Sequence, residues 1–320
     1  MAPPTLRTTT LNNLVTSTFE ERRPGLVDNF FGSAPLLAYI RKRENVSLKG
    51  GTEIRENFVY ADFPASSYGR GSEFDTSTKE FSTAMVFDWK FNYAPVNLDV
   101  IDVDLNDSPK AVFDLVEAAM ETGELSLIDE MSTQLFADGT GNTNKDLDGL
   151  ANAVSRSTSV AYGGITRSAT AGTPGSALRA GVENTTGGTL SLAQTNSDYG
   201  SCVIGREKPD LMVTTQTLWD RFWERSQTSE RNKPEPDRDI GFESVRFNAA
   251  QVTVDSHCPS GYLYYLNTKW WKFYTHSKWD FRFRGFMEPT NQQRQIGQII
   301  SWGNVICRSP RLQGVATGLS

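Results

Sequence analysis

The sequence has 320 residues, with 38 acidic and 32 basic side chains, and a formal net charge of −6. Hydrophobic residues make up 38% of it, aromatic residues 11% and charged residues 22%, which supports one large or two modest domains and excludes a collagen-like, coiled-coil or wholly disordered chain. A negative net charge also argues against a protein that holds nucleic acid mainly by neutralising phosphates.

The three cysteines, Cys202, Cys258 and Cys307, are odd in number and widely spaced, which is a poor disulfide framework. We expect three buried thiols in a reducing compartment. No run of apolar residues reaches the length that spans a bilayer, and residues 1–7 lack the pattern of a secretory signal. We therefore expect a chain that is made and folded inside a cell and has no membrane partner.

Residues 1–49 do not have the pattern of a folded core, because prolines and glycines interrupt everything around a short amphipathic helix expected over 12–19. The segment carries seven basic and four acidic side chains, and its apolar groups include Phe30, Phe31, Leu36 and Leu37. An extended arm cannot bury such groups against itself. It must lie on its own domain or on a neighbouring subunit.

Residues 50–103 have a β pattern in two parts, 52–60 and 81–103, joined by about 20 polar residues. A connection of that length predicts a protruding hairpin, and a disordered surface loop is the alternative. The second part alternates clearly. Its large side chains are expected on one face: Met85, Phe87, Trp89, Phe91 and Tyr93.

The strongest single element follows at 109–136. Pro109 suits the first helical position, apolar residues recur at spacings of three and four from Val112 to Leu135, and Gly139 ends the pattern. A helix of this span would be roughly 42 Å long. Gly123 near its middle is expected to mark a bend, and the many acidic residues are expected on a solvated face.

The rest of the chain is expected to be mixed. Residues 139–200 are rich in small polar residues and predict loops with short strands and a helix. Residues 209–215 predict a buried strand that leads into a helix over 216–226 with one aromatic face. Further strands are predicted from their composition and turn residues, at 244–247, 251–255, 261–267, 279–286 and 295–307.

The sequence contains no convincing catalytic or metal-binding pattern. His257 and Cys258 are adjacent, but neighbours on a strand point to opposite faces, and no Gly-x-Ser-x-Gly turn accompanies them. The two histidines and three cysteines have no zinc-ligand spacing. Residues 138–146 resemble a calcium loop in composition only, since the final Glu is missing. We predict no catalytic, cofactor-binding or metal-binding residues, no cofactor and no enzymatic activity.

The order of these parts resembles the major capsid proteins of tailed bacteriophages, which have the Hong Kong 97-type fold. The resemblance is carried by short stretches spread over about 180 residues. They are 135–142 (LFADGTGN), 147–150 (LDGL), 162–165 (YGGI), 208–215 (KPDLMVTT), 246–248 (RFN), 254–258 (VDSHC) and 302–304 (WGN), with Pro310 and Arg311 near the end.

The resemblance implies an α+β fold with four parts. Residues 1–49 would be an N-terminal arm and 50–85 an extended loop (the E-loop) that lies over an adjacent subunit. Residues 86–139 and 266–300 would form a peripheral domain with its spine helix at 109–136. Residues 140–265 and 301–320 would form an axial domain at the centre of hexamers and pentamers.

The resemblance also implies a function and partners. The chain would be a major capsid protein that self-assembles, in the host cytoplasm, into the icosahedral shell of a virion. Its partners would be other copies of itself, scaffold, portal and decoration proteins, and packaged double-stranded DNA contacted without sequence specificity. Two alternatives stay open: an encapsulin-type compartment with the same fold, and a β-rich hydrolase that uses paired acids.

Two sets of residues are expected to carry these contacts. Aromatic and aliphatic side chains of the loop and the arm would bridge neighbouring subunits: Phe30, Phe31, Leu36, Leu37, Phe63, Tyr68, Phe74 and Phe81. Basic side chains of the arm would face DNA: Arg22, Arg23, Arg41, Lys42 and Arg43.

Overall fold

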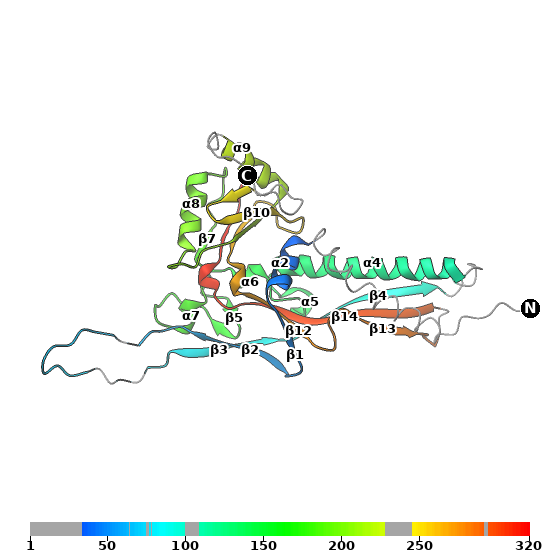
Figure 1. Ribbon diagram of the computed structural model, residues 1–320, viewed down its shortest axis with the longest axis horizontal. Helices are drawn as coiled ribbons and strands as arrows, with labels where there is room; N and C mark the ends of the chain where they lie inside the picture. Colours follow the sequence, from blue (N-terminus) through cyan, green and yellow to red (C-terminus); the bar gives the residue numbers. More distant parts are fainter. Residues whose placement is uncertain are drawn as a thin grey trace, which may run out of the picture.

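The computed structural model describes residues 34–63, 65–74, 77, 79–99, 109–227, 245–290 and 294–320. Figure 1 shows a lower layer made of one sheet with the long helix α4 alongside it, an upper unit built around a second sheet, and a long hairpin that projects from the body. The helix expected over 12–19 lies outside the described residues.

The lower layer is a five-stranded sheet assembled from segments far apart in the chain. Its strands are β1 (Asn45–Leu48), β4 (Lys90–Asp99), β12 (Trp271–His276), β13 (Arg282–Met287) and β14 (Arg294–Cys307). β14 lies at the centre, because it pairs antiparallel with β4, β12 and β13. The sequence pattern did not predict β12, which is almost wholly buried.

Helix α4 (Pro109–Phe136) has the predicted bounds and packs against β4 and β14. From Val116 onward the predicted apolar stripe is buried. α4 is one continuous helix through Gly123. This glycine permits close packing, because a Cβ there would lie 2.9 Å from Cγ2 of Val96 and 3.3 Å from Cδ1 of Ile299. Glu124 is also buried, so the acidic residues do not all face solvent as expected.

The predicted single strand over 81–103 is two strands, β3 (Ser82–Asp88) and β4. β3 buries Met85 and Phe87, whereas β4 buries the alternate residues Ala94, Val96 and Leu98. Phe91 and Tyr93 are therefore exposed on the opposite face, which corrects the expectation of one continuous face. The change occurs at Trp89, where the chain leaves the hairpin and enters the sheet.

The upper unit is a six-stranded sheet in the order β7 (Val182–Asn184), β15 (Gly314–Ala316), β11 (Leu263–Leu266), β8 (Leu211–Thr214), β10 (Ala250–Val254) and β9 (Val245–Phe247). Helices α8 (Leu192–Ser201) and α9 (Gln216–Gln227) lie around it (Figure 1). β8 is buried at every residue, as its pattern predicted, and Leu218 and Phe222 form the inner face of α9.

Shorter elements connect the longer ones. They are α5 (Gly141–Asn144), α6 (Leu150–Ala153), β5 (Ala161–Tyr162), β6 (Ile165–Thr166), α7 (Pro174–Ala177), η1 (Thr268–Trp270) and η2 (Pro310–Leu312). The predicted domain boundary at residue 300 needs correction. Because β14 is one unbroken strand, residues 301–307 belong to the five-stranded sheet, and the chain returns to the six-stranded sheet only at β15.

The described part of the arm packs on its own subunit. Helix α2 (Pro35–Arg43) buries Leu36, Leu37 and Ile40, and β1 adds a parallel edge strand to β12. Asp255, a buried residue that follows β10, accepts a hydrogen bond of 3.2 Å from the backbone N–H of Leu36 in the first turn of the helix. The sequence pattern did not predict this helix, because it has only nine residues and Asp255, which accepts from its first turn, lies 219 residues away.

Candidate contact surfaces

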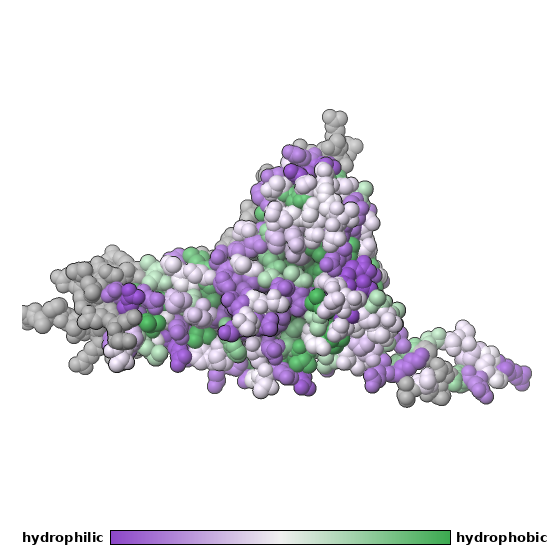
Figure 2. All heavy atoms as spheres, turned by 180° about the vertical axis from the view of Figure 1, so that it is seen from behind, coloured by the Kyte–Doolittle hydropathy of each residue, from purple (hydrophilic) through white to green (hydrophobic). Residues whose placement is uncertain are grey.

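Four exposed aromatic side chains lie in the loop of the hairpin, residues 60–81 between β2 (Glu53–Val59) and β3. Phe63 pairs with Phe81 across the loop at a ring distance of 5.0 Å, and Tyr68 pairs with Phe74 at 5.1 Å. The four side chains are 59%, 41%, 73% and 66% exposed, in that order. Figure 2 shows the loop as a narrow projection beyond the body, so the body of the subunit does not cover these rings.

The root of the hairpin, in contrast, is held by a partly buried charged cluster. Glu56 on β2 accepts a hydrogen bond of 2.5 Å from the Tyr274 hydroxyl and forms ion pairs with Lys272 and Arg308. Burial, followed by the hydrogen bond to Glu56, raises the pKa of Tyr274. All three partners belong to the five-stranded sheet or the residue after it, so the cluster joins the hairpin to that sheet.

A second contact holds the root of β3. The backbone N–H of Val86 donates to the Gly163 carbonyl at 3.0 Å, and Phe87 packs edge-on against Tyr162 at 5.0 Å. Gly163 has φ +57°, and a Cβ there would lie 2.6 Å from Cβ of Met85. A glycine is required because the turn after β5 both adopts a left-handed conformation and touches the hairpin. The root is therefore attached to the body at several points, although the loop beyond it is exposed.

An aromatic strip on the five-stranded sheet was not identified as a contact candidate from sequence. It consists of Trp89, Phe91, His276, Trp279 and Trp302, whose neighbouring rings lie 5.1–5.8 Å apart. Phe91 is 57% exposed, and Tyr93 beside it is 67% exposed. The alternation of residues 279–286 predicted a half-exposed sheet, but only the pairing of β4 with β14 places Phe91 beside Trp302.

The arm residues differ from the expectation. Leu36 and Leu37 are each 1% exposed and belong to the subunit's own hydrophobic core, so they are not available to a neighbour. This corrects the expectation for these two residues, and the reason is the helical face of α2, which packs inward. Phe30 and Phe31 lie outside the described residues.

Two of the basic residues expected to face DNA form ion pairs within the subunit. Arg41 binds both carboxylate oxygens of Asp280 at 2.7 Å and lies over the Phe281 ring at 4.7 Å. Arg43 forms an ion pair with Asp210. Their charges are compensated internally, which corrects the expectation for Arg41 and Arg43. Lys42 also has an interaction within the subunit, and Arg22 and Arg23 lie outside the described residues.

His257 has a structural environment. Its Nε2 lies 2.8 Å from Oδ1 of Asp129 on α4, and its Nδ1 lies 3.2 Å from Oδ1 of Asp255. It therefore connects the long helix to the loop after β10. Burial raises the pKa of the adjacent Cys258 thiol to about 12, which opposes formation of the nucleophilic thiolate.

The stretch 138–146 is a tight turn held by its own side chains. Thr140 donates through its backbone N–H and its hydroxyl to Asp138, at 3.0 and 2.7 Å, and Asn142 donates to Asp146 at 2.7 Å. Within the described parts of the chain, no group of three His, Cys, Asp or Glu side chains has the geometry of a metal site. Among the described helices, none combines the length and apolarity that crossing a membrane requires.

No family model and no curated protein match the sequence. Solved structures do match. The capsid of cyanophage A-1(L) has a TM-score of 0.67 at 14% identity, over 90% of this chain and 93% of that chain. The encapsulin of a holo-SrpI complex from Synechococcus elongatus has a TM-score of 0.57 at 11% identity, over 88% and 86%. A chain of Mycobacterium phage Adephagia has a TM-score of 0.52 at 12% identity, over 88% and 90%.

These similarities extend over nearly the whole of each chain. At such low identities they establish the fold. The chain has the α+β, Hong Kong 97-type fold of capsid shells, as predicted from the sequence.

Proposed function

We propose that this chain is the major capsid protein of a tailed bacteriophage, a structural protein and not an enzyme, whose copies assemble into an icosahedral shell around double-stranded DNA. The observation that carries the proposal is the hairpin. Its root is fixed by the Glu56 cluster, while its loop presents four aromatic rings that the body of the subunit leaves exposed. Apolar groups held in this way favour burial on another copy of the same chain.

The proposal assigns a mechanical role to the loop. Packed DNA pushes outward on a shell, so the shell must be held by many subunit contacts, each of modest size. The rings of Phe63, Tyr68, Phe74 and Phe81 would lie on neighbouring subunits and join them. A root attached at several points would transmit the load from the loop to the five-stranded sheet of its own subunit.

The remaining parts take their roles from the same proposal. The five-stranded sheet with α4 would be the peripheral domain, and the six-stranded sheet would be the axial domain at the centre of hexamers and pentamers. Scaffold, portal and decoration proteins would be partners, and assembly would take place in the host cytoplasm. Packaged DNA would be contacted without sequence specificity, and the net charge of −6 disfavours tight binding of its phosphates to the shell.

An encapsulin-type compartment is the second candidate, because the holo-SrpI encapsulin has a comparable TM-score of 0.57. The two functions differ in what the shell contains. Particles purified from the native source should hold nuclease-protected DNA if the chain is a phage capsid protein. A single dominant cargo protein and no protected DNA would favour the compartment.

The experiment that tests assembly uses the full chain and a deletion of residues 62–79. Size-exclusion chromatography and negative-stain microscopy should show closed particles or free capsomers for the full chain. The deletion should give a folded subunit that forms no closed shells, because the root and both sheets stay intact. Normal particles from the deletion would overturn the role of the loop. A full chain that elutes as a small oligomer at every concentration would overturn the capsid function itself.

A further inference from the structure

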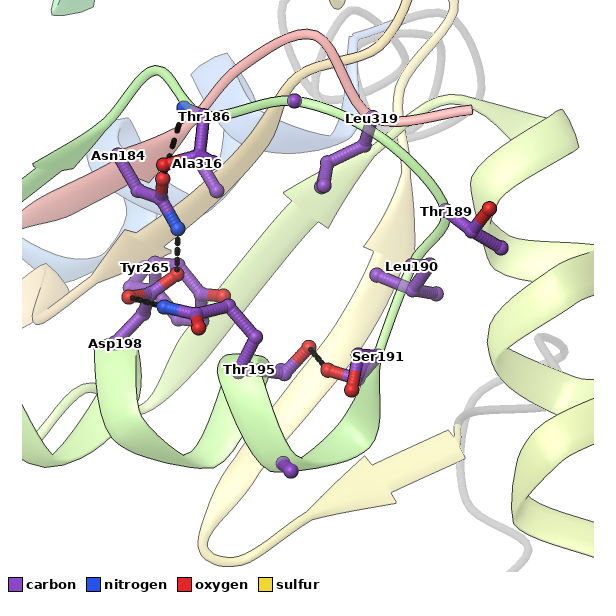
Figure 3. Close-up of a pocket in the computed structure, with 13 residues that line it drawn as sticks. Asn184, Thr186, Thr189, Leu190, Ser191, Thr195, Asp198, Tyr265, Ala316 and Leu319 are labelled. Carbon is purple, nitrogen blue, oxygen red and sulfur yellow. Dashed lines mark hydrogen bonds between the residues drawn. The ribbon is translucent and has the colours of Figure 1, made fainter.

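The six-stranded sheet borders a cavity of about 390 Å³ that has no place in the proposed shell contacts. It lies between α8, the end of β7, β11 and β15 (Figure 3). Binding pockets for small molecules are typically roughly 300–1,000 Å³. Its lining residues come from three parts of the chain: 184–198, Tyr265 and 316–319.

One end of the cavity holds a buried carboxylate. Asp198 is 4% exposed, because Thr195, Asp198 and Tyr199 share the inward face of α8. Its Oδ2 accepts from the Asn184 amide and its Oδ1 from the Gln194 amide, both at 2.9 Å (Figure 3). A carboxylate has about four acceptor sites, so each oxygen retains the capacity for a further hydrogen bond.

The Asp198 charge has no cationic partner among the described residues. Arg156 and Arg311 are close enough to influence the pKa of Cys202, as Asp198 does. They donate instead to backbone carbonyls, Arg156 to that of Gly181 and Arg311 to that of Ser201. Buried charges in proteins are usually paired. The subunit therefore leaves an acidic group without the cation that would normally accompany it.

The Tyr265 hydroxyl is a second, independent feature of the same cavity. Tyr265 is 0% exposed, and its hydroxyl has no hydrogen-bond partner among the described residues. Thr195 lies beside it, but the hydrogen of the Thr195 hydroxyl is donated to the Ser191 carbonyl at 2.9 Å and not to the Tyr265 oxygen. Burial and the Asp198 charge both raise the pKa of Tyr265, so the phenol keeps its proton beside the carboxylate. A buried hydroxyl without a partner requires explanation.

The opposite wall is apolar. Leu190, Ala316 and Leu319 line it, and the C-terminal residues close the rim, where the backbone N–H of Ser320 donates to Gly188 at 2.9 Å. A site with one acid end and one apolar wall matches a cation on an alkyl stem. A metal ion matches less well, because Asp198 is the one acidic residue in the lining and hard cations take several oxygen ligands.

We propose that this cavity binds the head of an organic cation, an ammonium or guanidinium group on an aliphatic stem. The head would donate to Asp198 and to the Tyr265 oxygen, and the stem would lie along Leu190 and Leu319. Two sources share this chemistry: a free alkylamine or polyamine, and a Lys or Arg side chain of a neighbouring copy. The proposal is independent of the shell function.

The first test uses the unaltered full chain in its unassembled form. Calorimetric titration at pH 7 with n-butylammonium is expected to show saturable binding, and 1-butanol, which has the same stem without the charge, should bind about tenfold more weakly or less. Absence of saturable n-butylammonium binding, or equal affinity for the two probes, would overturn the proposal. This comparison needs no variant, so it stands even where a variant fails to fold.

Variants then locate the site. D198N should weaken n-butylammonium binding about tenfold, and Y265F, which removes only the hydroxyl, about threefold. The matched control is D220N, because Asp220 is an exposed acid on α9 in the same unit and its loss changes the net charge equally. Wild-type affinity in a folded D198N would overturn the proposal, and so would an equal loss in D220N.

A last experiment distinguishes a free amine from a basic side chain of a neighbouring copy. Binding of n-butylammonium to assembled particles as well as to unassembled subunits would assign the site to a free amine. Binding only to unassembled subunits would show that a basic side chain of a neighbouring copy fills it. Should neither particles nor capsomers form, the proposed shell function fails, and the titration of the unassembled chain alone decides this proposal.

Discussion

Glu56 and Tyr274, which lie 218 residues apart in the chain, are joined by a hydrogen bond of 2.5 Å from the tyrosine hydroxyl to the carboxylate. Glu56 is on the first strand of the hairpin, and Tyr274 is on the five-stranded sheet. With the ion pairs to Lys272 and Arg308, this contact fixes the direction in which the hairpin leaves the body. The hairpin is therefore attached to the sheet at its root.

Substitution E56Q should lower the free energy of unfolding by about 2 kcal/mol, because it leaves two partly buried cations without their carboxylate. The control is E53Q, since Glu53 pairs with Arg55 on the exposed side of the same strand, where their side chains are 41% and 71% exposed. Exposed pairs contribute about 0–1 kcal/mol. Urea unfolding of both variants measures the difference, and equal losses would contradict the role of the cluster.

Substitution G123A should destabilise the protein by about 1 kcal/mol or more, although alanine favours helices, because its Cβ would lie 2.9 Å from Cγ2 of Val96. Removing that methyl group with V96A should relieve the clash. The loss in the double variant should therefore be smaller than the sum of the single losses, by about 0.5–3 kcal/mol. Additive losses in urea unfolding would show that the helix does not touch β4 there.

Substitution R41K should lower the free energy of unfolding by about 1 kcal/mol, since lysine keeps the charge but lacks the planar guanidinium that lies over Phe281 while it binds Asp280. The control R55K alters an exposed pair and should change little. Thermal or urea unfolding measures both. If R41K left stability unchanged while particles lost DNA, Arg41 would be a DNA contact and not an internal one.

Stability should decrease at alkaline pH. Burial raises the pKa of the Cys202 and Cys258 thiols from 9.0 to about 12, so these thiols ionise more readily in the unfolded chain. Their contribution is complete below pH 9 and is lost between pH 9 and 12. Each thiol contributes a slope of about 1.4 kcal/mol per pH unit in that window. The free energy of unfolding, measured in urea, should decrease less steeply between pH 9 and 11 for C258A than for the wild type. Parallel curves would contradict the assignment.

The double variant Y68S/F74S should abolish closed particles and leave the subunit folded. The two rings pair with each other in the loop, and each is more than half exposed. The conservative pair Y68F/F74Y keeps both rings and should assemble normally. Electron microscopy counts closed particles, and circular dichroism confirms that each subunit is folded. Assembly of the serine variant at the wild-type level would show that the rings carry no contact.

Local sequence patterns predicted the elements whose signals lie within a few residues of one another. The helix at 109–136 has a proline start, an apolar stripe at spacings of three and four, and a glycine stop. The hairpin is marked by two β segments around a polar connection. In contrast, the patterns missed α2 and β12, whose short apolar runs become ordered only through contacts with each other and with distant strands.

The sequence alone determined the fold class, the long helix, the projecting loop with its four aromatic residues, and the buried state of the cysteines. The fold class follows from the resemblance to a known family, and the other properties follow from periodicity and composition, which act over one or two turns or strands. Only the tertiary structure decided that Arg41 and Arg43 neutralise Asp280 and Asp210, that strand pairing continues to Cys307, and that Asp198 and Tyr265 meet in one cavity. Such pairings join residues tens to hundreds of positions apart, and which of the many acids and bases meet depends on how the two sheets pack.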